Sequence, residues 1–384
     1  MLTRQQSLHL LAALRKRQTE MVRLIGCFVR SESPSTSKAA VDRFGRMVAA
    51  EWTGRGARVA VLRQRDCGNH LRVTWPGREK QQRPILVLGH LDTVYALGTL
   101  AGMPFHLARG RAFGPGTFDM KGGLVLALFA ADALLRADCP PRRPVIFLWT
   151  SDEETGSATS RAVIEREARR SAAVLVLEPA SGLEGRLKTR RKGIGSAELL
   201  ITGRAAHAGL NPEDGVNAIH EMALQIARLA RLHQPRRGIT VSPTIAEGGT
   251  RSNVIPAQAR LVVDLRAPRA SDMRTVERQL RALRPILAGA KLRVRGGFTR
   301  PPLERRASAV LFARAQQVAK DMGLRLRETA SGGGSDGSFT AALGVPTLDG
   351  LGAVGEGAHS HDENIVVRAL PERAALLAGL LATI

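Results

Sequence analysis

Acidic and histidine side chains follow three short apolar runs in this chain of 384 residues. Gly-His-Leu-Asp (89–92) follows residues 85–88, Ser-Asp-Glu-Glu (151–154) follows residues 145–149, and Glu178 follows residues 173–177. A further carboxylate, Asp119, lies in the glycine-rich stretch 114–123, just before an expected helix. If these carboxylates gather in one place, their repulsion requires compensating positive charge. A divalent cation supplies that charge and explains the histidine, because imidazole together with carboxylate oxygen suits zinc or a similar first-row ion.

Spacing within two of these segments suggests particular roles. Residues two apart in an extended segment project the same way, so Asp92 is placed to accept the second ring N–H of His90 and orient the imidazole. Glu153 and Glu154 are adjacent and point apart, so one can bind metal while the other acts as general base on a water. The spacing does not decide which is which. Taken singly, each segment is more typical of an acidic surface turn, and Lys121 is more typical of a solvated residue at a helix start.

The three apolar runs alternate with segments of helical spacing. Residues 122–136 and 159–170 are the expected helices between the runs, and residues 3–30 and 36–53 show helical spacing before the first run. This alternation predicts a parallel α/β sheet. Ligands bind at the carboxyl ends of the strands in such sheets, so we expect the charged segments to meet in one crevice.

Residues 193–303 follow a different pattern. They read as strands at 194–202, 239–246, 257–265 and 292–298, with helices at 216–232 and 271–283. This predicts an α+β unit with a four-stranded, mostly antiparallel sheet and two helices. The predicted fold class is therefore α/β, with a mostly parallel catalytic sheet covered by helices on both faces. Residues 1–192 and 304–384 form this catalytic domain, and 193–303 are inserted into it.

Composition limits the classes of protein to consider. The formal net charge is +23, from 57 basic and 34 acidic residues, which attracts anions and favours non-specific binding of nucleic acid. The basic residues are scattered, and we find no helix-turn-helix or zinc-finger pattern, so no specific nucleic-acid partner is expected. Three cysteines without paired spacing indicate reduced thiols and a cytoplasmic location. The most apolar segments are too short or interrupted to span a bilayer, so no membrane partner is expected.

The ordered motifs resemble those of the zinc-dependent aminoacylase, deacetylase and carboxypeptidase family. This family includes acetylornithine deacetylase, succinyl-diaminopimelate desuccinylase and the glutamate carboxypeptidases. The resemblance covers nearly the whole chain and is weakest in the first 80 residues. The motifs are Gly-His-Leu-Asp-Thr-Val (89–94), Gly-Pro-Gly-Thr-Phe-Asp-Met-Lys-Gly-Gly (114–123), Asp-Glu-Glu-Thr-Gly-Ser (152–157), Leu-Glu-Pro (177–179), Ala-His-Ala-Gly (206–209), Ser-Asn-Val-Ile-Pro (252–256), Ser-Gly-Gly-Gly-Ser-Asp (331–336) and Gly-Ala-His-Ser (357–360).

The resemblance implies a pair of zinc ions, with cobalt or manganese as alternatives. The implied ligands are His90 and Glu178 at one ion, Glu154 and His359 at the other, and Asp119 bridging both. Asp92 would orient His90, Glu153 would be the general base, and the peptide bond after Asp119 would be cis. His359 is preferred to His361 because the family's histidine precedes a glutamate by four residues, and Glu363 fits that spacing.

The inserted unit resembles the family's lid, which also makes the homodimer in many members. His207 matches the histidine that stabilises the tetrahedral oxyanion in a neighbouring active site. Asn253 and Arg266 match positions that contact the carboxylate end of the substrate, and Gly333 lies in a glycine run whose N–H groups are expected to help. The resemblance therefore implies a homodimer and a small-molecule or short peptide substrate with a free carboxylate.

The implied reaction is hydrolysis of an amide bond by zinc-activated water. Local details favour a carboxypeptidase that releases a C-terminal glutamate or a similar amino acid. An N-acyl-amino-acid deacylase, such as an enzyme like acetylornithine deacetylase, is the alternative. A remote alternative is a non-catalytic anion- or nucleic-acid-binding protein on the same fold. The charge of +23 favours that remote reading, but the full set of five candidate ligands plus a base argues against it.

Overall fold

The computed structural model describes residues 2–384, which divide into two compact units. The first unit contains the chain up to Thr189, together with Arg305–Ala330 and Ser335–Ile384, and the second contains Arg190–Glu304 and Ser331–Gly334. The inserted segment expected at 193–303 falls within the second unit.

Residues 331–334 belong to the second unit, whereas the sequence had assigned them to the catalytic domain. Backbone and side-chain hydrogen bonds explain this difference. The N–H of Lys192 donates to the carbonyl of Ser331 at 3.1 Å, and Nη1 of Arg191 donates to the carbonyl of Gly334 at 2.7 Å.

A six-stranded sheet forms the centre of the first unit. Strand β3 pairs in parallel with both β6 and β7, and β16 continues the parallel set beyond β7. Strand β2 pairs antiparallel with β6 on one side and with β1 on the other. The sheet is therefore mostly parallel, as predicted, but the antiparallel strands β1 and β2 at one side of it were not predicted. In sheet order the strands are β1 (Arg58–Leu62), β2 (His70–Trp75), β6 (Val145–Thr150), β3 (Ile85–His90), β7 (Ala173–Val176) and β16 (Thr347–Leu348).

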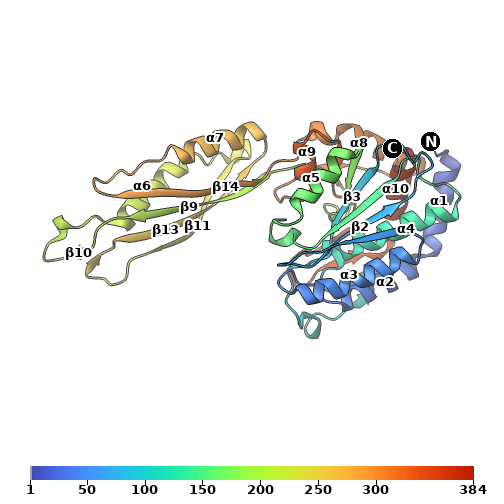
Figure 1. The fold of residues 1–384 in the computed structure, drawn as a ribbon, viewed down its shortest axis with the longest axis horizontal. Coiled ribbons are helices and arrows are strands. Elements are labelled where there is room, and N and C mark those ends of the chain that lie inside the picture. Colours follow the sequence, from blue (N-terminus) through green and yellow to red (C-terminus); the bar gives the residue numbers. More distant parts are fainter. Residues whose placement is uncertain (1) are drawn as a thin grey trace. The chain divides into compact units, whose positions relative to one another are not determined.

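Helices cover both faces of this sheet, and Figure 1 shows α5 on one side with α2 and α3 on the other. Along β3, Ile85 and Val87 join a core shared with α1 to α4, α8 and α10, whereas Leu86 and Leu88 join a core shared with α5 and α9. Burial on both faces explains the continuous apolar run of this strand. The helices are α1 (Arg4–Lys16), α2 (Gln18–Arg30), α3 (Lys38–Thr53), α4 (Gly122–Arg136), α5 (Arg161–Arg170), α8 (Arg305–Asp321), α9 (Gly337–Ala342) and α10 (Leu370–Thr383).

The single helical stretch expected at 3–30 is in fact two helices. The chain leaves the helical conformation at Arg17, where φ is −104° and ψ is 11°. The Arg17 side chain binds Asp132 of α4 and Glu20 of α2. Apolar spacing continues through the break, so the sequence pattern alone gave no sign of it.

A small antiparallel sheet of the first unit lies next to the segment that carries Asp119. The N–H of Gly114, which follows β5, donates to the carbonyl of Glu363, which precedes β18, at 3.2 Å. The strands in order are β17 (Gly355–Glu356), β18 (Asn364–Val366), β5 (Arg111–Phe113) and β4 (His106–Ala108). Other short elements are η1 (Thr99–Ala101), η2 (Thr117–Lys121), η3 (Glu153–Thr155), η6 (Val367–Ala369) and the pair β8 (Leu187–Arg191) and β15 (Glu328–Ser331).

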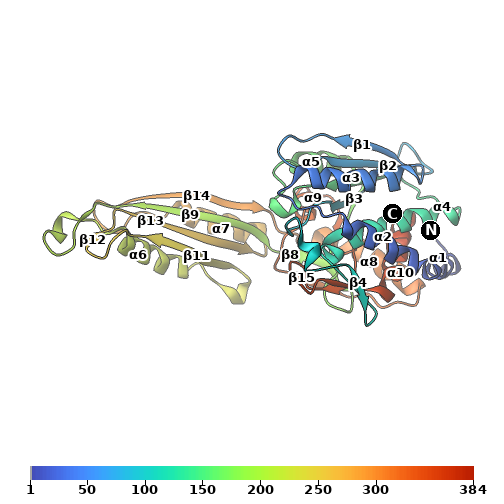
Figure 2. The ribbon, with the colours of Figure 1, turned by 90° about the horizontal axis from the view of Figure 1, so that it is seen from below.

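The second unit is a four-stranded antiparallel sheet with two helices, as predicted (Figure 2). Helices α6 and α7 share one core with alternate residues of the strands, including Leu199 and Ile201 of β9 and Leu261 and Val263 of β13. In sheet order the strands are β11 (Thr240–Gly248), β13 (Gln258–Ala267), β9 (Gly193–Thr202) and β14 (Lys291–Arg300). The helices are α6 (Ala218–Ala230) and α7 (Ala270–Arg281), and the minor elements are β10 (Ala206–His207), β12 (Val254–Ile255), η4 (Pro212–Asp214) and η5 (Pro235–Arg237).

Across residues 2–384, no helix is both long enough and apolar enough to cross a membrane.

Candidate metal centre

Three neighbouring parallel strands deliver the charged segments to one edge of the central sheet. His90 is the last residue of β3, the turn η3 with Glu153 and Glu154 follows β6, and Glu178 follows β7. Because β6 and β7 flank β3 in parallel, their carboxyl ends meet at the same edge. The sequence-predicted convergence of these segments is therefore present in the fold.

The first group of donor atoms surrounds the imidazole of His90. Its Nε2 lies 3.1 Å from Oδ1 of Asp119 and 3.8 Å from Oε1 of Glu178. One donor atom from each of these three residues lies within 4.8 Å of the others. His90 is 2% exposed and Glu178 is 7% exposed, so the group is largely removed from solvent.

A second group shares Asp119 with the first. Nε2 of His359 lies 3.4 Å from Oδ2 of Asp119 and 3.3 Å from Oε2 of Glu154. The two oxygens of Asp119 thus face different histidines. We call His90, Asp119, Glu154, Glu178 and His359 the candidate metal centre, and they are the five residues expected as ligands from the sequence.

The electrostatics of the candidate metal centre favour added positive charge. Burial alone would lower the pKa of His90, but its hydrogen bonds to Asp119 and Asp92 hold that pKa well above the usual value. Hydrogen bonds to Asp119 and Glu154 raise the pKa of His359 to about 10. The carboxylates therefore draw protons onto both imidazoles, and metal cations can take the place of those protons.

An unsatisfied carboxylate oxygen gives a direct test of whether cations fit here. Oε1 of Glu154 is buried and has no hydrogen-bond partner among the described residues. A buried carboxylate oxygen without a partner is strongly unfavourable, and a cation is a suitable partner for it. Two donor groups that share one bridging carboxylate match the requirements of a pair of metal ions.

The carboxylate of Asp92 supports the turn that carries Glu153 and Glu154. Its two oxygens accept the backbone N–H groups of Glu153 at 3.4 Å and of Glu154 at 3.3 Å. Nδ1 of His90 lies 2.9 Å from the backbone carbonyl of Asp92, whereas the nearest carboxylate oxygen is 3.6 Å away. Asp92 therefore contacts the ring of His90 through its backbone carbonyl, while its carboxylate accepts the η3 N–H groups and the hydroxyl of Ser35 at 2.7 Å.

Glu363 holds the loop that presents Asp119, a role that sequence reasoning missed. Its carboxylate accepts N–H groups from Gly116 at 2.8 Å, Phe118 at 2.7 Å and Asp119 at 2.8 Å. Burial raises the pKa of Glu363 to about 7, against the opposing effect of these donors. In the sequence, the only sign that Glu363 matters was that it follows His359 by four residues.

The backbone of this loop is irregular. Gly116 lies at a φ of 73°, and a Cβ atom there would approach Cγ2 of Thr93 to 2.8 Å. The peptide bond between Asp119 and Met120 is cis, as the family resemblance implied.

Lys121 is buried, so its interpretation as a solvated residue was wrong. It is 2% exposed, and its Nζ donates to the carbonyls of Phe28 at 3.1 Å and Ser31 at 2.9 Å. Burial lowers the pKa of this amine to about 7. Lys121 therefore fastens η2 to the end of α2, an effect that depends on tertiary contacts and not on local pattern.

A third group of potential ligands consists of Cys67, His70 and Asp152, and Asp152 directly precedes the turn η3. The hydroxyl of Thr159 already occupies its centre. Oγ1 of Thr159 lies 3.1 Å from Sγ of Cys67, 3.1 Å from Nε2 of His70 and 2.8 Å from Oδ2 of Asp152. This group is therefore a hydrogen-bond network that supports the residue before Glu153.

The remaining predicted site residues belong to the second unit, where they form two local pairs. His207 in β10 lies next to Asn253, because the N–H of Ala208 donates to the carbonyl of Asn253 at 2.9 Å. Arg266 binds Asp264 on its own strand at 2.9 Å, and its Nη1 donates to the carbonyl of Gly332 at 3.4 Å, beside Gly333. His361 is exposed and belongs to none of the three donor groups found among the described residues.

Comparison with known sequences places these features in context. Residues 86–383 match the sequence profile described as Peptidase family M20/M25/M40. The chain is 31% identical over 373 residues to carboxypeptidase G2 of Pseudomonas sp. (strain RS-16). This alignment covers 95% of this chain and 89% of that protein. It is 30% identical over 329 residues to succinyl-diaminopimelate desuccinylase of Dechloromonas aromatica (strain RCB), with 80% and 85% covered.

Solved structures show the same fold. Aminopeptidase PepT from Bacillus cereus ATCC 10987 aligns with a TM-score of 0.80 at 23% identity, over 95% of this chain and 98% of that chain. The Bacillus subtilis YXEP protein, described as a dinuclear metal-binding peptidase from the M20 family, aligns with a TM-score of 0.72 at 16% identity, over 95% and 97%.

Proposed function

Because this chain belongs to peptidase family M20/M25/M40 and is a hydrolase of amide or peptide bonds, we propose that it is a two-zinc carboxypeptidase that releases a C-terminal glutamate or a similar amino acid. The observation that carries this proposal is the arrangement of five donor residues in two groups joined by Asp119. The similarity to carboxypeptidase G2 over almost the whole chain supports the choice of reaction.

The donor set determines which residues would hold the metal ions. His90 and Glu178 would bind one ion, His359 and Glu154 the other, and Asp119 would bridge them. Imidazole and carboxylate donors suit zinc, and also accept cobalt or manganese. When bound, such ions polarise the scissile carbonyl and lower the pKa of a coordinated water.

Glu153 is the proposed general base. It is adjacent to Glu154 on η3, and the side chain of Glu154 is 7% exposed and lies 3.3 Å from Nε2 of His359. Because Glu154 faces His359, Glu153 is the glutamate proposed to take a proton from the attacking water and to return it to the leaving amine. The hydrogen bonds of Asp92 to both backbone N–H groups keep this turn in place.

Residues of the second unit are proposed to recognise the substrate. A guanidinium group can bind a carboxylate through two N–H groups, and Arg266 is partly exposed near the glycine run that contains Gly333. Asn253 would add a polar contact, and His207 would stabilise the oxyanion. The bond of Arg266 to Asp264 fixes the orientation of its side chain and leaves other guanidinium N–H groups for a substrate.

The second unit is also the proposed site of homodimerisation. Its edge strand β11 is mostly exposed and includes Ile245, which is 46% exposed. Ile219 and Leu210 of the same unit are 39% and 80% exposed. Exposed edge strands and apolar side chains favour association with another chain. Light scattering coupled to gel filtration would test this, and a monomer at micromolar concentration would contradict it.

The reduced cysteines remain the basis for proposing a cytoplasmic location. Cys27, Cys67 and Cys139 are all free, and a disulfide-dependent protein of an oxidising compartment would be expected to pair them.

An N-acyl-amino-acid deacylase is the second candidate. The similarity to succinyl-diaminopimelate desuccinylases, at about 30% identity over most of the chain, favours it. A substrate comparison separates the two functions. We expect the zinc-loaded protein to hydrolyse N-acyl-glutamates and folate-like glutamate conjugates faster than N-acetylornithine or N-succinyl-diaminopimelate. The reverse order would replace the carboxypeptidase with the deacylase.

The role of Glu153 is tested by replacing it with glutamine. Loss of a general base lowers kcat by roughly 10² to 10⁴-fold, while the metal content should stay near that of the unmodified protein. Undiminished hydrolysis by Glu153→Gln would show that another group takes the proton.

A further inference from the structure

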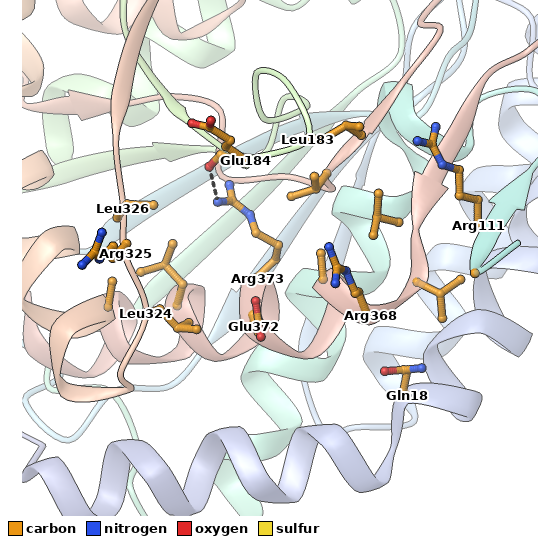
Figure 3. A pocket seen from close by; sticks show the side chains of 18 of the residues that line it. Gln18, Arg111, Leu183, Glu184, Leu324, Arg325, Leu326, Arg368, Glu372 and Arg373 are labelled. Carbon is orange, nitrogen blue, oxygen red and sulfur yellow. Dashed lines mark hydrogen bonds between the residues drawn. The ribbon is translucent and has the colours of Figure 1, made fainter.

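A cavity of about 810 Å³ in the first unit is lined by none of the candidate metal-centre residues. Its walls come from the turn between β4 and β5, the loop after β7, the segment between α8 and β15, the turn η6 and the first turns of α10. Figure 3 shows side chains of this lining, with Arg325 and Arg111 at opposite ends of the view and Arg373 and Arg368 between them.

The lining of this cavity carries excess positive charge. It contains five arginines, which are Arg109, Arg111, Arg325, Arg368 and Arg373, and two glutamates, which are Glu184 and Glu372. Both glutamates already have cationic partners that are not in the lining. Glu184 pairs with Arg186 at 3.0 Å and Arg327 at 3.4 Å, and Glu372 pairs with Arg15 at 3.3 Å. With five arginines against two glutamates, the lining keeps an excess of positive charge.

Three of the lining arginines are available to a ligand. Within residues 2–384, the side chains of Arg109, Arg325 and Arg368 have no hydrogen-bond or ion-pair partner, and all three are exposed. Arg111 instead binds Glu356 at 2.6 Å and Asn364 at 3.0 Å. Guanidinium groups without partners that line one cavity favour a carboxylate or phosphate group.

The floor of the cavity contains a buried cation that no carboxylate binds in the described part of the chain. Arg373 is 5% exposed, and its guanidinium donates to the carbonyls of Gly352 at 2.9 Å, Gly185 at 3.1 Å and Gly350. Burial lowers the pKa of this group to about 10, so it still carries its charge at neutral pH. Carbonyl groups bind its nitrogens without cancelling its charge, which only nearby Glu372 offsets in part, so the guanidinium adds to the positive potential of the cavity.

Apolar side chains form the rest of the wall. Leu183, Leu326, Val354, Val367 and Leu376 all line the cavity. A site with an apolar wall and a few convergent charged groups is typical of small-molecule binding. The ligand should therefore combine an apolar body with an anionic group.

We propose that this cavity is a second ligand site, separate from the candidate metal centre, which binds a small organic anion through Arg325 and Arg368 over the buried guanidinium of Arg373. The chemistry shared by suitable ligands is a carboxylate or phosphate group attached to an apolar body. The size of the cavity lies in the usual range for small-molecule sites.

Isothermal titration of the zinc-loaded protein tests this proposal with three probes of similar shape. They are 4-phenylbutyrate, 2-phenylethyl phosphate and the uncharged 4-phenylbutanamide. We expect one or both anions to bind and the amide to bind at least about ten-fold more weakly. Preference between the two anions identifies the anionic group. Binding of the amide as tightly as both anions, or binding of none of the three, would overturn the proposal.

Matched variants locate the bound probe. Arg325→Gln and Arg368→Gln should each weaken anion binding by about ten-fold while leaving amide hydrolysis unchanged, because both side chains are exposed and unpaired. Arg43→Gln and Arg46→Gln on α3 remove the same charge from exposed positions outside the cavity and should leave binding unchanged. If the cavity variants and the α3 variants weakened binding equally, general surface charge would explain the effect and the proposal would be wrong. Unaltered binding in Arg325→Gln and Arg368→Gln would place the probe elsewhere, for instance at the metal ions.

Discussion

Glu363→Gln changes the carboxylate that holds the loop before Asp119 without changing its size. In the native chain both oxygens of Glu363 are used, one for Gly116 and the other for Phe118 and Asp119. A glutamine has one acceptor oxygen and an amide group that only donates. Whichever way it is oriented, its amide must face at least one backbone N–H group. The loop therefore loses hydrogen bonds in a buried place where water does not replace them.

The magnitude follows from these contacts. Hydrogen bonds to a charged group contribute about 1.5–3 kcal/mol each, compared with about 0.5–1.5 kcal/mol for neutral ones, and a buried unsatisfied N–H costs about 1–3 kcal/mol. One lost bond and two weakened ones give a loss of about 2–4 kcal/mol in the free energy of unfolding of the first unit. The displaced loop should also weaken metal binding, since Asp119 is the carboxylate shared by both donor groups.

Urea unfolding at about pH 8.5, where Glu363 with its pKa of about 7 is ionised, measures this loss through tryptophan fluorescence. All three tryptophans of the chain, Trp52, Trp75 and Trp149, are buried in the first unit and report on it alone. Glu356→Gln is a matched control on the neighbouring strand β17, where the side chain is half exposed and pairs with Arg111, so it should change stability by less than about 1 kcal/mol. If Glu363→Gln were as stable as this control and bound metal equally well, the loop would not depend on Glu363 and our reasoning would be wrong.

Two further predictions concern the first unit. Gly352→Ala should lower stability by roughly 1–3 kcal/mol and impair the metal centre, because its Cβ would lie 2.2 Å from the carbonyl oxygen of Leu177 and 2.8 Å from that of Glu178. Gly102→Ala, where nothing lies within 4 Å, is the control, and equal thermal midpoints for the two variants would contradict the argument. Burial alone would raise the pKa of Asp132, but hydrogen bonds from Arg17 and Arg136 hold it below its usual value, so the ionised form stabilises the fold above the unfolded pKa of 3.8. The stability gap between the native chain and Asp132→Asn should therefore be constant above about pH 5 and narrow as the pH falls through 3.8 towards the lower pKa of the folded state, and a gap of unchanged size at about pH 3 would refute it.

Residues 85–88, 145–149 and 173–177 could be placed from the sequence because each is a short apolar run with burial on both faces. Their order along the chain then fixed which ends share an edge of the sheet. Strand β2 was missed although it alternates, with Leu71, Val73 and Trp75 buried and Arg72 and Thr74 less so. The alternation of this strand could have been recognised in the sequence. Its antiparallel pairing with β1 and β6 could not, because it depends on the tertiary arrangement of the strands.

The candidate metal centre could be predicted because its donors stand in ordered motifs. The groups that hold those donors could not. Lys121 looks solvated in sequence because only the fold brings the carbonyls of Phe28 and Ser31 to its amine. The hydrogen bonds between Glu363 and the loop before Asp119 likewise join residues that are more than two hundred positions apart in the chain. Supporting contacts of this kind arise from tertiary structure and leave no local pattern.

Metal analysis of the purified protein, combined with hydrolysis before and after chelation, tests the central claim most directly. The account predicts two divalent ions per chain, loss of amide hydrolysis when a chelator removes them, and recovery when zinc is added back. It also predicts that Asp119→Ala, which removes the carboxylate common to both donor groups, retains neither the metal nor the activity. A metal-free protein that hydrolysed its substrate at the full rate would contradict the assignment.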